Sequence, residues 1–322
     1  MSYTSDNSYV RKQFIEVPLP VECGVFRKIC HKLIGIILLP GCLFAAYILK
    51  TPGTGIHIKL IFQALGLFFL RRISLRTCCS LMFYAMDSTR YFEFHEVLNS
   101  ASKVPFRRYL DISSPRLIPF MLLARNKSVL LDMINPDNRD LTEAQDLSVS
   151  LGLAVRCSFQ NNTIEAAEYP ADKFDLITCV SVLEHIPEDK EAVIKMWSLL
   201  CPGGRLILTL PCRASALEQY ISRDEYGVLP PAFEGYTFWQ RFYDEVRLRD
   251  IIFSVTGLPV KRIIYGERKC GLFYRNATKK RLLGPLYPFW RESYMMAREY
   301  RYFKTLAELP GEGVVMLEFV KP

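Results

Sequence analysis

Residues 173–211 read KFDLITCVSVLEHIPEDKEAVIKMWSLLCPGGRLILTLP, and this stretch decides the fold class. An apolar run at 175–181 is followed by an amphipathic segment at 188–201 and by a second apolar run at 205–211. Short apolar runs that alternate with helical patterns are typical of βαβ units in a parallel sheet. The stretch therefore predicts two buried strands joined by one helix, which stops at the turn Pro202-Gly203-Gly204.

The same alternation extends along the chain in both directions. It predicts a mainly parallel α/β sheet with five further strands, at 108–112, 128–134, 153–159, 260–266 and 313–320. Helices are expected at 117–125 and 141–152, and another is expected to be capped near Asp244. Residues 212–259 are a long insert between strands, which we expect to cover a substrate or simply to pack. Its aromatic side chains are Tyr220, Tyr226, Tyr236, Phe238, Trp239 and Phe242.

Composition restricts the class of protein. The chain has 322 residues, of which 50% are hydrophobic and 23% charged, so disorder is excluded and one large or two modest domains are expected. The net charge of +8 is too small to indicate a nucleic-acid partner. Ten cysteines without metal-binding spacing indicate reduced thiols. The polar start Met1–Val10 does not resemble a signal peptide, so a cytoplasmic protein is expected.

The first 85 residues differ from the rest. Apolar runs occupy 33–49 and 60–70, and no acidic residue lies between Cys23 and Met86, whereas eight basic residues do. We therefore predict that residues 1–85 form a hydrophobic, basic helical region on the cytosolic face of a membrane, before a main domain at 86–322. Both runs are shorter than the roughly 20 residues of a spanning helix. Pro40-Gly41 favours a bent, re-entrant pair or an interfacial helix, and the alternative is two core helices.

Three short motifs in the deciding stretch carry a family resemblance. They are Phe174-Asp175-Leu176, Leu183-Glu184-His185-Ile186 and Leu199–Gly204, in this order. The run resembles the second half of a class I S-adenosylmethionine-dependent methyltransferase of type 11, and the resemblance covers roughly 105–320. It implies a Rossmann-like seven-stranded sheet and S-adenosylmethionine as cofactor. It also implies methyl transfer, which we expect to be O-methylation of a small-molecule, glycan or lipid-linked acceptor.

The resemblance also implies where the cofactor binds, because ligands of open parallel sheets lie beyond the carboxyl ends of the strands. Family members carry an acid and then Gly-x-Gly-x-Gly after the first strand. Here Asp111 is kept, Ser113 and Ser114 follow, and Pro115 replaces the second glycine. We expect Asp111, Ser113 and Ser114 to contact the cofactor. Since proline has neither the freedom nor the N–H of glycine, the loop either takes another path or binds more weakly.

Further contacts are expected after the later strands. Asp132 is the predicted carboxylate for the ribose hydroxyls, with Asn135 as its competitor, and Asn162, with its neighbour Asn161, is expected at the adenine. Ser181 is expected among the cofactor contacts. It also stands where metal-dependent relatives carry a glutamate, so we predict no metal.

His185 is the candidate catalytic base, because an ordinary pKa near 6.5 suits removal of a hydroxyl proton. The alternative is that the Glu184-His185 pair is structural. A rival for the whole chain is a non-catalytic binding or scaffold protein with the same fold. A nicotinamide enzyme would need Gly-x-Gly-x-x-Gly after the first strand, which is missing here.

Overall fold

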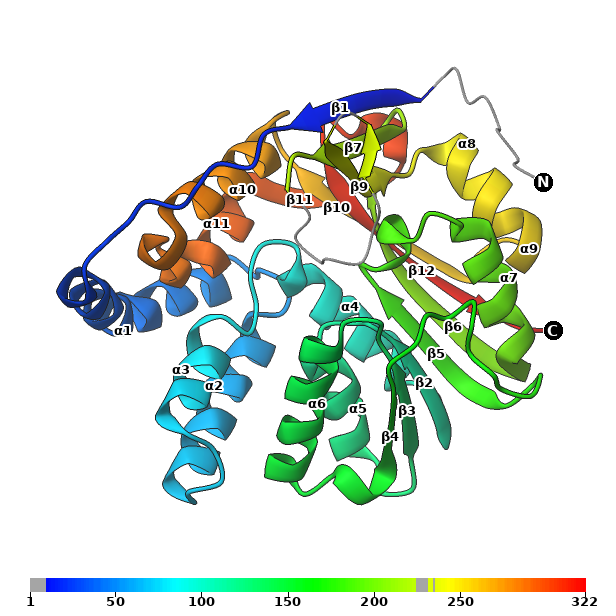
Figure 1. The fold of residues 1–322 in the computed structure, drawn as a ribbon, viewed down its shortest axis with the longest axis horizontal. Helices are drawn as coiled ribbons and strands as arrows, with labels where there is room; N and C mark the ends of the chain where they lie inside the picture. The colour runs from blue at the N-terminus through cyan, green and yellow to red at the C-terminus, as the bar shows by residue number, and fades with distance from the viewer. Residues whose placement is uncertain (1–9, 224–230, 234) are drawn as a thin grey trace.

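The structure is a computed structural model that describes residues 10–223, 231–233 and 235–322. Its centre is an eight-stranded sheet with the order β11-β10-β12-β6-β5-β2-β3-β4 (Figure 1). Strands β12 and β11 run antiparallel to β10, and β12 also runs antiparallel to β6. The strands are β2 Arg108–Ile112, β3 Leu130–Ile134, β4 Cys157–Gln160, β5 Phe174–Val180, β6 Leu200–Cys212, β10 Lys261–Glu267, β11 Tyr300–Phe303 and β12 Gly313–Val320.

The predicted α/β sheet is confirmed, and the structure adds the edge strand β11 to the seven that were expected. Alternate residues of the central strands point to opposite faces, which makes two cores. Leu176 and Val180 pack with α4, α5 and α6, whereas Ile177 and Cys179 pack with α7 and the helical segment at 245–256. The helices are α4 Arg90–Ala101, α5 Leu117–Arg125, α6 Asn138–Leu151, α7 Asp189–Leu199, α8 Glu245–Arg247, α9 Ser254–Thr256, α10 Leu272–Leu283 and α11 Glu292–Glu299.

Two local predictions need correction. The turn expected at Pro202-Gly203-Gly204 lies inside β6, because the C-terminal end of the chain offers it a partner: the Gly203 N–H donates to the Lys321 carbonyl. The strand expected at 153–159 begins with a 3-10 turn, and only β4 pairs with the sheet edge. The cap predicted at Asp244 is confirmed, since its carboxylate accepts the Arg247 N–H at 2.9 Å.

The insert forms a second, smaller sheet with the order β1-β7-β9-β8. Its strands are β1 Arg11–Ile15, β7 Leu217–Ile221, β8 Pro231–Phe233 and β9 Tyr236–Phe242. Strand β1 comes from the N-terminal region and pairs in parallel with β7, and Phe14 stacks on Tyr220 at 5.4 Å. The N-terminal region is therefore not only helical, and it is joined to the insert. Tyr226 of the insert lies outside the described residues.

Three helices, α1 Val25–Ile48, α2 Thr54–Phe69 and α3 Leu75–Phe83, make up the rest of the N-terminal region. At Pro40-Gly41, where a bent, re-entrant pair or an interfacial helix was expected, α1 continues through Pro40 as one helix. An interior proline removes one hydrogen bond of the helix and crowds the carbonyl four residues earlier. Packing of α1 on Phe83, Phe289 and Trp290 opposes that cost. With 24 residues and a mean hydropathy of 2.0 in its most apolar stretch, α1 is long and apolar enough to cross a membrane by length and composition.

Candidate functional site

A cavity of about 1230 Å³ lies beyond the carboxyl ends of β2, β3, β4 and β5. The chain passes from β2 outward to β3 and β4, then returns to place β5 on the other side of β2, so the cavity sits at the switch point of the sheet. Helices α3, α4 and α6 contribute its walls (Figure 1). Its polar lining at the strand ends includes Arg90, Ser113, Ser114, Asn135, Asp137, Asn162, Ser181 and His185.

Asp111 lies beneath the cavity, and its side chain does not line it. Its fully buried carboxylate accepts hydrogen bonds from the Thr178 hydroxyl at 2.7 Å, from the Tyr109 hydroxyl at 3.3 Å and from the Ser114 N–H at 3.2 Å. Burial raises the pKa of Asp111 to about 6, although these hydrogen bonds oppose the shift. Asp111 therefore positions the loop that follows β2, and its direct contact with a cofactor stays a prediction.

The loop Ser113-Ser114-Pro115 lines the cavity where relatives carry glycines. Ser113 adopts a positive φ of 48°, the conformation that glycine favours, and its N–H and hydroxyl both donate to the Ile134 carbonyl. The Ser114 hydroxyl accepts the Val180 N–H at 3.1 Å. Serine hydroxyls therefore tie this loop to β3 and β5, and the cavity stays open despite Pro115.

At the end of β3 the two candidate residues for the ribose contact occupy different positions. Asp132 lies in the middle of the strand, where it accepts hydrogen bonds from Lys173 at 3.2 Å and Tyr169 at 3.3 Å, and it does not line the cavity. Its competitor Asn135 does line the cavity, but both ends of its amide are used within the turn. Asp137, two residues further, is the acid that the turn brings to the cavity wall.

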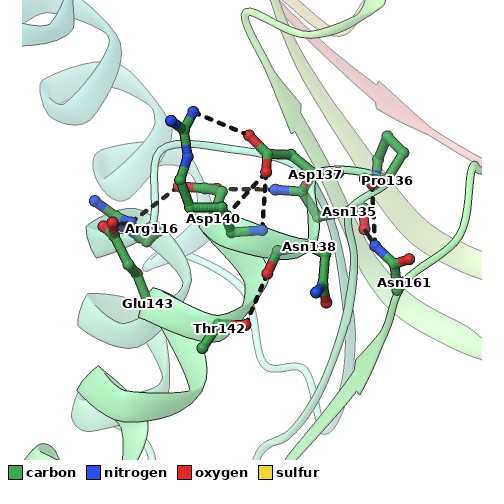
Figure 2. A network of polar contacts seen from close by, with 10 residues as sticks. Arg116, Asn135, Pro136, Asp137, Asn138, Asp140, Thr142, Glu143 and Asn161 are labelled. Carbon is green, nitrogen blue, oxygen red and sulfur yellow. Dashed lines mark hydrogen bonds and ion pairs between the residues drawn. The ribbon is translucent and has the colours of Figure 1, made fainter. Parts of the chain in front are cut away.

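Asp137 caps helix α6. Its Oδ1 accepts the N–H groups of Arg139 at 2.9 Å and Asp140 at 3.3 Å, and its Oδ2 forms an ion pair with the exposed Arg139 guanidinium. Figure 2 shows the network around it: Asn135 donates to Asp140, and Arg116 bridges Asp140 and Glu143. The Oδ1 atom of Asp137 is thus fixed by the backbone of α6. Its Oδ2 atom is paired, among the described residues, with the exposed Arg139 side chain alone.

The two asparagines after β4 have different roles. Asn161 donates to the carbonyls of Asn135 and Pro136 at 3.1 and 3.0 Å, so it ties the end of β4 to the turn after β3 (Figure 2). Asn162 lines the cavity, beside Thr163 and Ile164. The structure thus places Asn162 with the other site residues and gives Asn161 a structural role.

Ser181, at the end of β5, meets a buried carboxylate that the sequence analysis missed. Glu93 of α4 is fully buried, and it accepts hydrogen bonds from the hydroxyls of Ser181 and of Thr209, the latter at 2.7 Å. Arg90, one turn earlier on α4, forms an ion pair with Glu93 at 2.8 Å and lines the cavity. The spacing Arg90–Glu93 was visible in the sequence, but only the fold brings α4 to β5.

His185 lines the cavity, and its Nδ1 is hydrogen-bonded to the Trp239 carbonyl of the insert. Burial lowers the pKa of His185 to about 4. Its neighbour Glu184 is buried, which raises the pKa of that carboxyl to about 8, and its Oε2 has no hydrogen-bond partner among the described residues. A histidine with so low a pKa is a weak base, so this geometry favours the structural alternative for the pair.

The residues present fit the cofactor that the resemblance implies. Successive strand ends bring a serine loop, a carboxylate, an asparagine and a serine hydroxyl to one cavity, and Arg90 adds a cation. This donor and acceptor set matches an amino acid, a ribose and a base arranged along the switch point. The volume exceeds the range of roughly 300–1,000 Å³ usual for a single small ligand, which leaves room for an acceptor.

Residues 119–208 match the family model described as a methyltransferase domain. The ubiquinone/menaquinone biosynthesis C-methyltransferase of Pseudoalteromonas translucida is 32% identical over 89 residues, which are 28% of this chain and 32% of that protein. A ubiquinone biosynthesis O-methyltransferase of Xanthomonas euvesicatoria is 38% identical over 69 residues, which are 21% of this chain and 28% of that protein. The chain thus spans about a third or less of the length of these curated relatives.

Among solved structures, the crystal structure of the MccD protein matches with a TM-score of 0.50 and 10% sequence identity. The match covers 72% of this chain and 96% of that one. At this identity the likeness concerns the fold alone.

Proposed function

We propose that the chain is a class I, S-adenosylmethionine-dependent methyltransferase, which binds S-adenosylmethionine in the cavity and transfers its methyl group to an acceptor; the match of residues 119–208 to a methyltransferase domain supports this. The observation that carries the proposal is the convergence of Ser113, Asp137, Asn162 and Ser181 on one cavity at the switch point of the sheet. When bound, the cofactor supplies a methyl group on a positively charged sulfur.

Each strand end has a part in holding the cofactor in this proposal. The loop Ser113-Ser114 and the Arg90 guanidinium hold the methionine part, because arginine has donors beyond the one it gives to Glu93 and pairs well with a carboxylate. Asp137 accepts the ribose hydroxyls. Asn162 lies at the adenine. Asp111 acts from below by fixing the Ser114 N–H.

We propose O-methylation, with an acceptor hydroxyl placed at Ser181. The support is the buried pair of Glu93 and Ser181: a carboxylate orients the Ser181 hydroxyl at the cavity floor, and Arg90 balances its charge. His185 helps to shape the wall through its bond to the Trp239 carbonyl. Methyl transfer depends mainly on proximity and alignment of the two reacting atoms. The acceptor oxygen forms a bond to the methyl carbon, the methyl–sulfur bond breaks to leave S-adenosylhomocysteine, and the hydroxyl proton passes to solvent water.

We propose that the acceptor is a small molecule. The N-terminal helices favour a lipid-linked one, because they expose an apolar surface. Helix α1 exposes Phe26, Leu33, Ile37, Phe44 and Ile48 on one face, while the opposite face packs on the protein. We propose that this face lies on the cytosolic surface of a membrane, since an exposed apolar helix face flanked by cations is typical of interfacial helices. On this proposal, residues 1–85 are the membrane-associating region and residues 86–322 the catalytic one.

Calorimetric titration of the full chain with S-adenosylmethionine and with S-adenosylhomocysteine tests the proposal. We expect both to bind at one site, with adenosine triphosphate as the non-binding control. If neither compound binds, the proposal of a methyltransferase is wrong, and the alternative of a non-catalytic scaffold protein is favoured. The Ser113-Ser114-Pro115 loop is the feature that would explain that outcome.

A further inference from the structure

The turn between α2 and α3 exposes a compact group of large apolar side chains. Phe69, Leu70 and Leu75 are 76%, 71% and 62% exposed, and Phe62, seven residues before Phe69 and so on the same face of α2, is 70% exposed. Single exposed apolar residues are ordinary, whereas a cluster marks an interaction surface. We call Phe62, Phe69, Leu70 and Leu75 the apolar tip.

Cations surround the apolar tip. Arg71, Arg72 and Arg76 are exposed, and none of them forms an ion pair with a carboxylate in the part of the chain that the structure describes. No acidic residue occurs in the sequence between Glu22 and Asp87. Apolar side chains next to unpaired cations match an anionic bilayer, in which the arginines meet phosphates and the tip meets acyl chains.

The cavity reaches the same turn. Arg72, Ile73, Ser74 and Arg76 line it on one side and Ser150, near the end of α6, on the other. Ser150 lies twelve positions along α6 from Asn138, the first residue of this helix, which is about 18 Å along the helix axis. The cavity therefore extends from the strand ends to the apolar tip, where a second hollow shares Arg72, Ile73 and Ser74 with it and adds Phe68, Phe69 and Arg71.

We propose that the apolar tip inserts into an anionic bilayer and that the outer end of the cavity opens at the bilayer surface. The acceptor class that follows is an amphiphile of the bilayer, whose head enters the cavity toward Ser181 while its apolar chain stays among the lipids. The acceptor part of this inference rests on the proposed function. The insertion of the apolar tip is independent of the proposed function. It concerns a different surface from the exposed face of α1.

Tryptophan depth measurements test the insertion. Phe69→Trp and Leu75→Trp place a fluorophore on each side of the turn, and Leu258→Trp places one at an exposed apolar position before β10. The probes are vesicles of equimolar phosphatidylcholine and phosphatidylglycerol with bromine at a shallow acyl position. We expect quenching beyond that of the parent chain at 69 and 75 and none at 258. Vesicle binding without quenching at 69 and 75, or no binding, would overturn the inference.

A charge reversal tests the electrostatic part. Arg76→Glu should weaken binding to these vesicles about tenfold, whereas Lys190→Glu, at an exposed position of α7, should leave it unchanged. If both substitutions weaken vesicle binding equally, binding depends only on the net charge of the chain, and the proposal of a specific surface at the apolar tip is wrong. Cofactor titration separates this inference from the proposed function. If the chain binds S-adenosylhomocysteine but shows no quenching at positions 69 and 75, only the insertion of the apolar tip is wrong. If quenching occurs but S-adenosylhomocysteine does not bind, the proposed enzyme function is wrong.

Discussion

Asp137→Asn is the substitution that separates cofactor binding from helix capping. Asparagine caps helices as well as aspartate does, so α6 keeps its N-terminal hydrogen bonds. The substitution turns the carboxylate of Asp137 into an amide, which removes the charge and one acceptor. A hydrogen bond to a charged group contributes about 1.5–3 kcal/mol. Because the remaining amide oxygen still accepts, we expect the lower end of that range, a loss of about tenfold in affinity for S-adenosylhomocysteine.

The assay is calorimetric titration, with urea unfolding of the same samples as the stability control. Asp132→Asn is the matched variant, because Asp132 is hydrogen-bonded to Lys173 and Tyr169 away from the cavity. It should bind S-adenosylhomocysteine like the parent chain. The reverse pattern, in which Asp132→Asn loses affinity and Asp137→Asn keeps it, would show that our reading of the β3 end is wrong.

Three further predictions concern ionisation and packing. Because burial raises the pKa of Glu184 to about 8, the folded state binds this proton more tightly than the unfolded state, and the contribution of Glu184 to stability is lost as pH rises from about 4.5 to 8. Glu184→Gln should flatten that part of a urea-unfolding profile by up to about 1.4 kcal/mol per pH unit, and parallel profiles would contradict the burial argument. Since burial lowers the pKa of His185 to about 4, its ring resonances in NMR spectra should not shift between about pH 5.5 and 7, below the range in which the neighbouring Glu184 ionises 3.9 Å away; a titration near 6.5 would restore it as the candidate base. In α1, Gly35→Ala should destabilise the chain, because a Cβ there would lie 2.5 Å from the Phe289 ring, whereas Gly41→Ala meets nothing within 4 Å and should stabilise it by about 0.5–1 kcal/mol in thermal unfolding.

The central sheet was predictable because its strands carry their own signals. Mostly apolar runs such as Tyr109 to Ile112 and Phe174 to Val180 are buried between two layers of helices, so their composition marks them as strands. Strands β1 and β7 carry weaker patterns, and each depends on a partner more than 200 residues away in the chain. Such long-range strand pairing depends on the whole fold, and no local sequence pattern predicts it.

The site was predicted in part, for a similar reason. Ser113, Ser114, Asn162, Ser181 and His185 follow strands that were located correctly, and all of them line the cavity. Asp132 was chosen by its spacing from Asp111, but the strand continues through Ile134 and moves the end of β3 two residues onward. Glu93 was missed because its role depends on the packing of α4 against β5 and β6, which bring Ser181 and Thr209 to it.

The most direct test of the central claim is a crystal structure of the full chain grown with a saturating concentration of S-adenosylhomocysteine. The account predicts density for the ligand beyond the ends of β2, β3 and β5, with its carboxylate at Arg90, its ribose hydroxyls at Asp137 and its adenine at Asn162. Density for the ligand elsewhere, or a cavity without ligand under these conditions, would contradict the assignment of this cavity as a methyltransferase site.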